Sequence, residues 1–329
     1  MTAGPAIVVT GAAGFIGSHL TEALLARGRR VVGLDSFDDF YDPALKRANL
    51  AGAARDPAFR LVEGDIRDPA ALAAAFSRET IDGVFHLAAR AGVRPSIRDP
   101  VLYSSVNVDG TTRLLEACRR HGVGRFVFGS SSSVYGDNPK VPFAESDPVD
   151  HPISPYAATK KAGEVLCHAY HHLFGIRVAC LRFFTVYGPR QRPEMAIHKF
   201  ARLLLAGEPI ERYGDGSSAR DYTYITDIVD GVLRAHERCD GYHVWNLGGS
   251  QTTTLAELTA KLARRLGVEP RVRSLPQQPG DVRRTWADVS RARAELGWEP
   301  RVGLDEGLDR FVAWVRAAAR AAGVEGSTR

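Results

Sequence analysis

Cysteine is scarce in this sequence, and long apolar runs are absent. Its 329 residues include four cysteines, none in a CxxC pair or in a Cys/His cluster with the spacing of metal ligands. No apolar run approaches the ~20 residues of a membrane-spanning helix, and the first apolar segment has no basic leader before it. We therefore expect reduced thiols, no bound metal, no membrane association and a cytoplasmic location.

Lysine is also scarce, because it supplies only six of the 43 basic side chains. The formal charge of +5 therefore comes mostly from arginine, which suits bidentate contacts to phosphates and carboxylates but also occurs widely on protein surfaces. No basic run is interleaved with aromatic residues in the manner of a nucleic-acid groove. A nucleic-acid partner is not expected.

The first half of the chain alternates short apolar segments with segments of helical periodicity. Residues 6–10 are continuously apolar up to a threonine, as in a strand buried on both faces, and Ile16, Leu20 and Leu24 then follow helical spacing. This alternation predicts an α/β fold with a doubly wound parallel sheet. Further strands are expected at 30–35, 59–65, 83–89, 125–131 and 176–184, with helices near 70–79, 104–121 and 156–174.

The pattern loosens after residue 185, where turn signals such as Gly188-Pro189 become frequent. An apolar segment at 242–249 is expected to rejoin the large sheet as a strand. We expect a main domain over 1–185, rejoined by 240–249, and a smaller α/β substrate-binding domain over 186–329. Helices of the second part are expected near 195–206, 254–266 and 304–318.

A glycine-rich loop joins the first expected strand to the first expected helix. The segment 10–20 (TGAAGFIGSHL) places glycines at Gly11, Gly14 and Gly17, and Phe15 and Ile16 lie between the last two. Glycine permits a tight turn and a close approach of backbone to a pyrophosphate, and a helix N-terminus attracts negative charge. The spacing is GxxGxxG rather than GxGxxG, but its strand-to-helix context predicts a Rossmann-like dinucleotide site.

Asp35, at the end of the second expected strand, indicates which dinucleotide binds. A carboxylate there accepts hydrogen bonds from the adenine ribose and repels a 2′-phosphate, and residues 36–39 include no arginine to neutralise one. NAD is therefore expected rather than NADP. Residues after the third and fourth strands complete the predicted site, with strand-end packing as the alternative: Asp65 and Ile66 beside the adenine, and Leu87, Ala88 and Ala89 towards the nicotinamide.

Tyr156 and Lys160 are predicted catalytic and cofactor-binding residues. Their spacing of four places both on one helix face, where the ammonium and the positive nicotinamide would favour the phenolate as a base. Lys160 can also hold the nicotinamide ribose. Ser131 follows the fifth expected strand, where its hydroxyl can bridge substrate and phenol. An exposed helix face and a polar turn are the structural alternatives.

The glycine loop, this triad and the chain length resemble the extended short-chain dehydrogenase/reductase family of nucleotide-sugar enzymes. Within it the sequence looks most like UDP-glucuronate 4-epimerases. This resemblance implies a tightly bound NAD and a UDP-sugar held by the smaller domain. It rests on the segments 90–100 (RAGVRPSIRDP), 130–136 (SSSSVYG), 154–164 (SPYAATKKAGE) and 182–196 (RFFTVYGPRQRPEMA).

The residues after Ser131 favour epimerisation over other reactions of the family. Related 4,6-dehydratases carry acidic residues directly after this hydroxyl residue, and decarboxylating relatives tend to have a glutamate there. Here those positions are Ser132 and Ser133, which are candidates for contacts to the substrate but cannot serve as acid or base at neutral pH. The resemblance therefore implies oxidation at C4, a 4-keto sugar that turns over, and return of the hydride.

The remaining predicted contacts are to the substrate. A C5 carboxylate beside a C4 ketone readily leaves as carbon dioxide, so an epimerase should hold it, and Thr185 and Arg192, with Arg94 as a further candidate, can donate to it. A surface position is the alternative for any one arginine. Candidates for the UDP moiety are Lys199, Tyr213, Arg220, Asp281 and Arg284.

Three other functions stay open. A UDP-glucose 4-epimerase would use the same machinery on a neutral sugar, and a UDP-glucuronate decarboxylase would release UDP-xylose. A non-catalytic NAD-binding protein would not need Tyr156 and Lys160. Helices near 104–121 and 156–174 resemble those of a four-helix dimer interface in the family, so a homodimer is expected, although their periodicity fits internal packing equally well.

Overall fold

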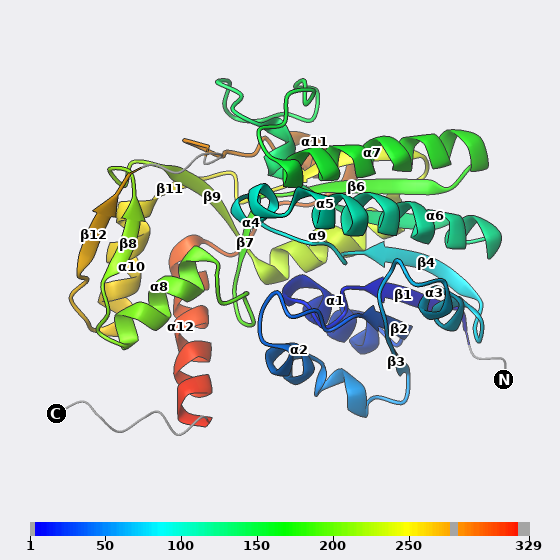
Figure 1. Cartoon of the computed structure of the whole chain (residues 1–329), viewed down its shortest axis with the longest axis horizontal. Coiled ribbons are helices and arrows are strands. Elements are labelled where there is room, and N and C mark those ends of the chain that lie inside the picture. The colour runs from blue at the N-terminus through cyan, green and yellow to red at the C-terminus, as the bar shows by residue number, and fades with distance from the viewer. Residues whose placement is uncertain (1–3, 277–281, 322–329) are drawn as a thin grey trace.

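The computed structural model describes residues 4–276 and 282–321. Seven parallel strands form its central sheet, with helices on both faces (Figure 1). This arrangement confirms the predicted doubly wound α/β fold. In spatial order the strands are β3 (Phe59–Glu63), β2 (Arg30–Asp35), β1 (Ala6–Thr10), β4 (Ile81–His86), β5 (Arg125–Ser131), β6 (Arg177–Phe183) and β10 (Tyr242–Leu247).

Alternate side chains of the sheet enter two different cores. Ile7 and Val9 join one core, whereas Ala6 and Val8 join the other, as expected for a strand buried on both faces. The helices over the first core are α1 (Phe15–Ala26), α9 (Ile225–Arg238) and α11 (Ser290–Leu296), and those over the second are α3 (Pro69–Phe76), α6 (Gly110–Arg120) and α7 (Pro155–Phe174).

Shorter helices lie in the connections between the strands. They are α2 (Pro43–Leu50), α4 (Val93–Arg98), α5 (Pro100–Ser104), the 3₁₀ turns Ala53–Arg55 and Ser132–Tyr135, and a π-helical turn at Ser105–Asp109. Helices α2, α4, α5, α9 and α11 are absent from the sequence-based expectation. No helix in the described ranges is long and apolar enough to span a membrane.

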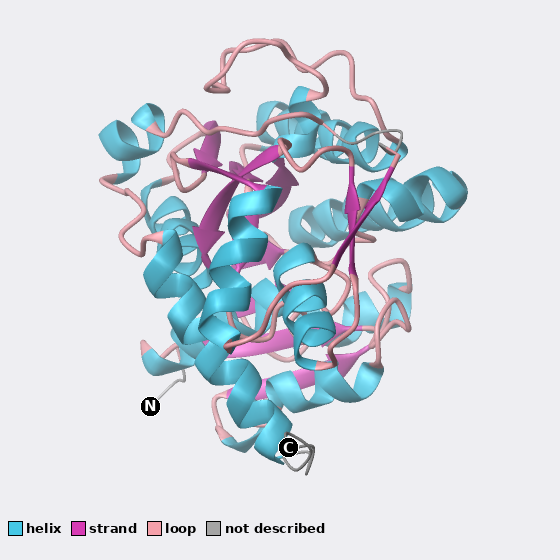
Figure 2. Ribbon diagram, turned by 90° about the vertical axis from the view of Figure 1, so that its left-hand side faces the viewer, coloured by secondary structure: helices cyan, strands magenta, loops and turns pink. Residues whose placement is uncertain are grey.

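The later part of the chain builds a smaller α/β layer beside the carboxyl edge of the sheet (Figures 1 and 2). It shares one apolar core with the large sheet, because Leu20 of α1 belongs to the same cluster as Phe200 and Leu262. Its elements are β7 (Thr185–Tyr187), α8 (Ala196–Leu205), β8 (Ile210–Tyr213), β9 (Ala219–Tyr224), β11 (Thr252–Thr254), α10 (Leu255–Leu266), β12 (Val272–Leu275) and α12 (Leu304–Ala321).

Candidate active site

The glycine loop brings bare backbone to the amino end of α1. Gly11 has a φ of +70°, and a Cβ there would lie 2.8 Å from the backbone nitrogen of Ala88. A Cβ on Gly17 would lie 2.0 Å from the carbonyl oxygen of Gly11. The helix starts after Gly14 with no side-chain cap and no acidic residue in its first turn. This end of α1 therefore fits a pyrophosphate, which its N–H groups and dipole would hold.

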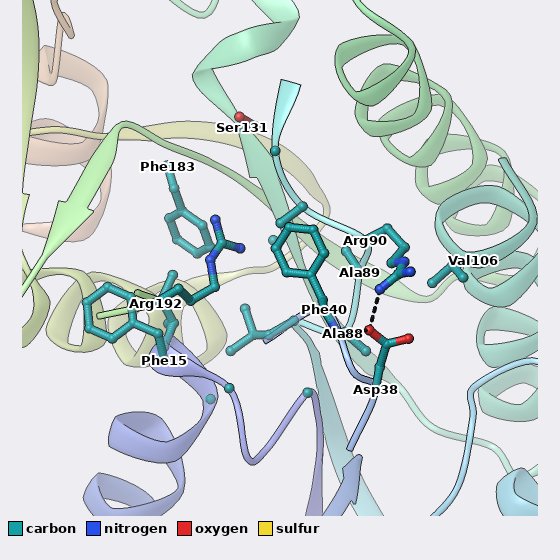
Figure 3. Close-up of a pocket in the computed structure, with 18 of the residues that line it drawn as sticks. Phe15, Asp38, Phe40, Ala88, Ala89, Arg90, Val106, Ser131, Phe183 and Arg192 are labelled. Carbon is teal, nitrogen blue, oxygen red and sulfur yellow. Dashed lines mark hydrogen bonds and ion pairs between the residues drawn. The ribbon is translucent and has the colours of Figure 1, made fainter. Parts of the chain in front are cut away.

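A cavity of about 390 Å³ opens at this loop, along the carboxyl edge of the sheet (Figure 3). It collects residues that the sequence predicted from widely separated segments. Those that line it are Gly11, Gly14, Phe15, Ile16, Gly17, Asp35, Asp65, Ile66, Leu87, Ala88, Ala89, Ser131, Ser132, Ser133, Tyr156, Lys160, Thr185 and Arg192.

Asp35 shapes the loop that it faces. Its two carboxylate oxygens accept hydrogen bonds from the backbone N–H groups of Ala13 and Phe37, both at 2.9 Å. Burial raises the pKa of Asp35, while those two bonds and the nearby Lys46 ammonium oppose the rise. Each oxygen keeps a further lone pair for a ribose hydroxyl. The Asp35 carboxylate thus holds the backbone of the loop and also offers acceptors to a ligand in the cavity.

Lys46 is a cavity residue that the sequence analysis missed. Its ammonium, 4.7 Å from the centre of the Tyr41 ring, donates to the carbonyl oxygen of Asp38. Lys46 belongs to α2. Two signals mark the start of this helix: the Asp42 side chain accepts a hydrogen bond from the Ala44 N–H, and a proline follows Asp42. That capping pattern is the signal that could have predicted the helix.

Other missed residues form the wall opposite Arg192. Arg90 pairs with Asp38, and its guanidinium lies 5.4 Å from the centre of the Phe40 ring. Figure 3 shows this pair on one side of the cavity and Arg192 with Phe183 on the other. Asp65 is held by Arg67 at 2.7 Å, and this hydrogen bonding lowers the pKa of Asp65. Charged side chains thus line the cavity on the side of Asp35.

Tyr156 and Lys160 stand one turn apart on α7, and both line the cavity. The Lys160 Nζ donates to the carbonyl oxygen of Gly129 at 2.6 Å and lies 6.0 Å from the centre of the Tyr156 ring. Burial, helped by the positive charge of Arg192, lowers the pKa of Lys160 to about 8. The helix therefore presents a phenol and a buried amine at the end of β5.

The pKa of Tyr156 is raised, chiefly because burial disfavours the phenolate. Hydrogen bonding by Ser131 and the charge of Arg192 act in the opposite direction. Arg192 thus adds a positive charge near the phenol besides the predicted charge of Lys160, whose Nζ lies 6.0 Å from the centre of the Tyr156 ring. The Lys160 ammonium also donates to the backbone of β5.

The serine run after β5 lines the cavity without an acidic neighbour. Ser131 donates from its hydroxyl to the Ser133 hydroxyl at 3.1 Å and accepts from the Ser133 N–H at 3.2 Å. Within the described ranges, the only carboxylates that line this cavity are those of Asp35, Asp38 and Asp65. None of them follows the serines in sequence, so no acid adjoins Ser131 as it would in a dehydratase.

Arg192 and Thr185 line the cavity on the side of the smaller layer. The Arg192 Nε lies 2.8 Å from Oε1 of Glu194, and its guanidinium lies 5.8 Å from the centre of the Phe40 ring. Thr185 also lines a second cavity of about 270 Å³, so the two spaces meet at this residue.

The predicted UDP-binding residues gather around that second cavity and a third one. Arg94, Lys199, Tyr213 and Arg220 line the second cavity, and the guanidinium of Arg94 stacks 4.3 Å above the Tyr213 ring. Arg284 lies apart from these, in a third cavity that Tyr213 and Arg220 also line. Asp281 lies outside the described residues.

Known proteins with similar sequences include nucleotide-sugar enzymes. A model of the NAD dependent epimerase/dehydratase family matches residues 7–248. A UDP-glucuronate 4-epimerase of Thermodesulfobacterium geofontis is 42% identical over 93% of this chain and 95% of its own length. These matches confirm the resemblance to nucleotide-sugar epimerases.

Solved structures agree over nearly the whole chain. The crystal structure of UDP-glucuronic acid 4-epimerase from Bacillus cereus, in complex with UDP-glucuronic acid and NAD, has a TM-score of 0.90 at 39% identity, covering 95% of this chain and 99% of that one. UDP-glucose 4-epimerase from Thermotoga maritima, with UDP-glucose, has a TM-score of 0.87 at 36% identity over the same shares.

The family match runs from the first strand of the large sheet to its last. The likeness therefore extends over the complete nucleotide-binding fold and not only the glycine loop. The chain belongs to the NAD dependent epimerase/dehydratase family.

Proposed function

We propose that this enzyme interconverts UDP-glucuronate and UDP-galacturonate by 4-epimerisation. The carrying observation is the distribution of charge around one cavity. Tyr156 and Ser131 line it, Arg192 and Thr185 line it on the side of the smaller layer, and among the described residues its carboxylates are those of Asp35, Asp38 and Asp65. The similarity to the UDP-glucuronate 4-epimerases of Thermodesulfobacterium geofontis and Bacillus cereus supports the same substrate.

The catalytic residues move a proton at O4 of the sugar. NAD, held by the glycine loop and Asp35, would supply a reversible hydride acceptor for C4. Tyr156 takes the O4 proton and gives it back, Ser131 bridges the phenol and the sugar hydroxyl, and Lys160 supports the phenolate from the next turn of α7. The serines at 132 and 133 offer no acid for elimination, which leaves hydride return and loss of the C5 carboxylate as the two fates of the 4-keto sugar.

The carboxylate of the sugar needs a partner of its own. Beside a C4 ketone it is poised to leave as carbon dioxide, and a charge-assisted hydrogen bond from Arg192, with a second from the Thr185 hydroxyl, holds it out of the orientation for cleavage. Arg192 is the assigned partner rather than Arg94, because Arg192 lines the same cavity as Tyr156, whereas Arg94 lines the second one.

The second cavity is assigned to UDP. Arg94, Lys199 and Arg220 bring positive charge to it, and the Tyr213 ring offers a surface for stacking. Residues 1–185 with 240–249 then hold NAD and contribute Arg94, Ser131 and Tyr156 to the UDP-sugar, whose other proposed contacts come from 186–329. Firm contacts to UDP and looser contacts to the sugar allow the 4-keto ring to turn over.

We also propose that the enzyme is a homodimer. Large apolar side chains are exposed on α4, α5 and α7, which contact one another: Ile97 at 48%, Val101 at 77%, Val165 at 55% and Leu173 at 66%. A second copy of the chain would cover them. Size-exclusion chromatography with light scattering tests this, with Val165→Glu expected to yield a monomer.

The four buried, free cysteines support a reducing, cytoplasmic location.

Incubation with UDP-glucuronate, without added NAD, tests the proposed reaction. UDP-galacturonate should appear with no net NADH, because the hydride returns in every cycle. UDP-xylose as the main product would make the enzyme a decarboxylase. Turnover of UDP-glucose with no turnover of UDP-glucuronate would make it a neutral-sugar epimerase.

A further inference from the structure

Glu164 is a buried carboxylate with no part in the chemistry described so far. It lies on α7, eight residues after Tyr156 and four after Lys160, so the three side chains share one face of the helix. Glu164 is 1% exposed, and its ion-pair partner Arg182 is 3% exposed. Within the described residues these two form a fully buried ion pair directly behind the catalytic groups.

The Glu164 carboxylate joins two neighbouring strands of the sheet. Its Oε1 accepts from the Ser130 hydroxyl at 2.6 Å and from the Arg182 Nε at 2.9 Å, and its Oε2 accepts from a terminal nitrogen of Arg182 at 2.9 Å. Ser130 of β5 and Arg182 of β6 are direct partners in the register of the sheet. One side chain of α7 thus clamps the carboxyl ends of both strands.

The clamp acts immediately before the catalytic serine. Lys160 holds the carbonyl oxygen of Gly129, Glu164 holds the hydroxyl of Ser130, and the next residue along β5 is Ser131. Two consecutive residues of the strand are therefore tied to the helix that carries Tyr156. With both ties in place, Ser131 has little freedom to shift relative to the phenol.

Stability alone does not account for such a pair. Burying two charges costs desolvation energy that their attraction roughly offsets, and apolar replacements of buried pairs are often as stable. A bidentate arginine–carboxylate contact gives fixed geometry instead. The Glu164 carboxylate also lies where β5, which carries Ser131, must be aligned with α7, which carries Tyr156.

We propose that Glu164 is a positioning residue for catalysis, which aligns the Ser131 hydroxyl with the Tyr156 phenol by clamping β5 and β6 to α7. This inference rests on the catalytic roles proposed above for Ser131 and Tyr156. It adds a residue that touches neither sugar nor dinucleotide and acts through Ser130.

Three variants test this role in the full-length protein. Ser130→Ala removes the hydroxyl tie and keeps the ion pair, whereas Glu164→Gln keeps an acceptor for Ser130 and removes the charge. Asp227→Asn is the matched control, because Asp227 is also a buried carboxylate, accepts from the N–H groups of Arg301 and Val302, and does not line the cavity.

We expect kcat of Ser130→Ala and Glu164→Gln to fall by about 10- to 100-fold, as for small misalignments of reacting groups, with KM, UDP affinity and NAD content within about twofold. Asp227→Asn should lower the melting temperature and leave kcat unchanged. Parallel changes of kcat and melting temperature in all three variants would overturn the proposal. If Glu164→Gln fails to fold, Ser130→Ala decides.

A second readout separates this proposal from the proposed substrate. If the wild type does not turn over UDP-glucuronate, the substrate assignment fails, and the variants are compared with UDP-glucose. Crystal structures of wild type and Ser130→Ala give the distance between the Ser131 and Tyr156 hydroxyls without any turnover. A longer distance in the variant supports the clamp, and an unchanged distance overturns it.

Discussion

The Nε of Arg192 lies 2.8 Å from Oε1 of Glu194, two residues further along the chain. The distance is that of an ion pair, yet the angle does not meet hydrogen-bond geometry, and Nε is a buried donor without an acceptor. Glu194 therefore holds Arg192 mainly by charge. The guanidinium is oriented in the cavity while it keeps hydrogen-bonding capacity for a second carboxylate.

Arg192→Ala should weaken UDP-glucuronate binding more than UDP-glucose binding. A hydrogen bond to a charged group is worth about 1.5–3 kcal/mol, so the loss should be roughly 10- to 150-fold for the uronate. The fraction of UDP-pentose among the products should also rise, because the carboxylate is no longer held. Calorimetry and product analysis check both effects. Unchanged uronate affinity together with an unchanged product ratio would contradict the assignment.

Glu194→Gln should act in the opposite direction on the same ligand. Removing the carboxylate that shares the guanidinium leaves more of its charge for the substrate. Glu194 is 42% exposed in its side chain, so solvent screens the effect and a two- to fivefold gain in UDP-glucuronate affinity is about the size expected. Affinity for UDP itself is the internal control and should stay the same. Weaker binding of UDP-glucuronate would mean that Glu194 orients Arg192 by more than charge.

Tyr156→Phe should abolish turnover while leaving the ligands bound. Loss of a general acid–base group lowers kcat by ~10²- to 10⁴-fold. NAD content after purification and the dissociation constant of UDP-glucuronate should match the wild type, since the ring keeps its place on α7. A variant that retains most of its kcat would show that another group moves the O4 proton.

Asp35→Asn should lower NAD retention and loosen the loop that Asp35 holds. One oxygen becomes an amide nitrogen, so one of the bonds from Ala13 or Phe37 is lost together with a contact to the ribose. The dissociation constant for NAD should rise about tenfold, the effect of one hydrogen bond. Asp38→Asn is the control, because Asp38 pairs with Arg90. Equal effects of the two variants would argue against a special role for Asp35.

Two buried histidines should make the fold sensitive to acid. Burial lowers the pKa of His236 to about 4 and that of His86 to about 3. The unfolded chain takes up these protons near pH 6.5, so the stabilisation is complete above that pH and is lost as the pH falls towards 4. His236 accounts for up to about 3 kcal/mol of this loss.

Urea unfolding at pH 7 and pH 5 measures that loss. His236→Phe should make the difference between the two pH values smaller, since a neutral ring then packs against Phe85. His172→Asn replaces an exposed imidazole and should leave the difference as in the wild type. An unaltered pH dependence in His236→Phe would assign the acid sensitivity elsewhere.

The sheet was predictable because its strands are short apolar runs bounded by turns. The same reasoning missed α9, although Ile225, Ile228 and Val232 have helical spacing. Gly231 within this segment reads as a helix breaker, yet the fold needs it, because a Cβ there would lie 2.8 Å from the Leu247 side chain. Close packing of α9 against β10 thus accounts for a glycine that helix propensity alone would disfavour.

The cavity was predictable where a motif stands at the end of a strand, as for Gly11 and Asp35. Lys46 and Glu194 could not be found in this way, because neither stands at the end of a strand of the large sheet and each reaches its cavity through the tertiary placement of its helix or loop. The charge near Tyr156 shows the same limit. Spacing pointed to Lys160, and only the folded chain shows that the charge of Arg192 also acts on the phenol.

The apolar core that runs without interruption from α1 into α8 and α10 bears on how the reaction can proceed. Two parts that share one core cannot swing apart without exposing it to water, so opening and closing of the whole molecule is a poor way to turn a sugar. Under the proposed reaction the two parts of the protein keep their relative positions and the sugar ring of the substrate moves. Mutations that alter the rate at which the ring turns over should therefore lie among the residues that line the cavity, not at a hinge.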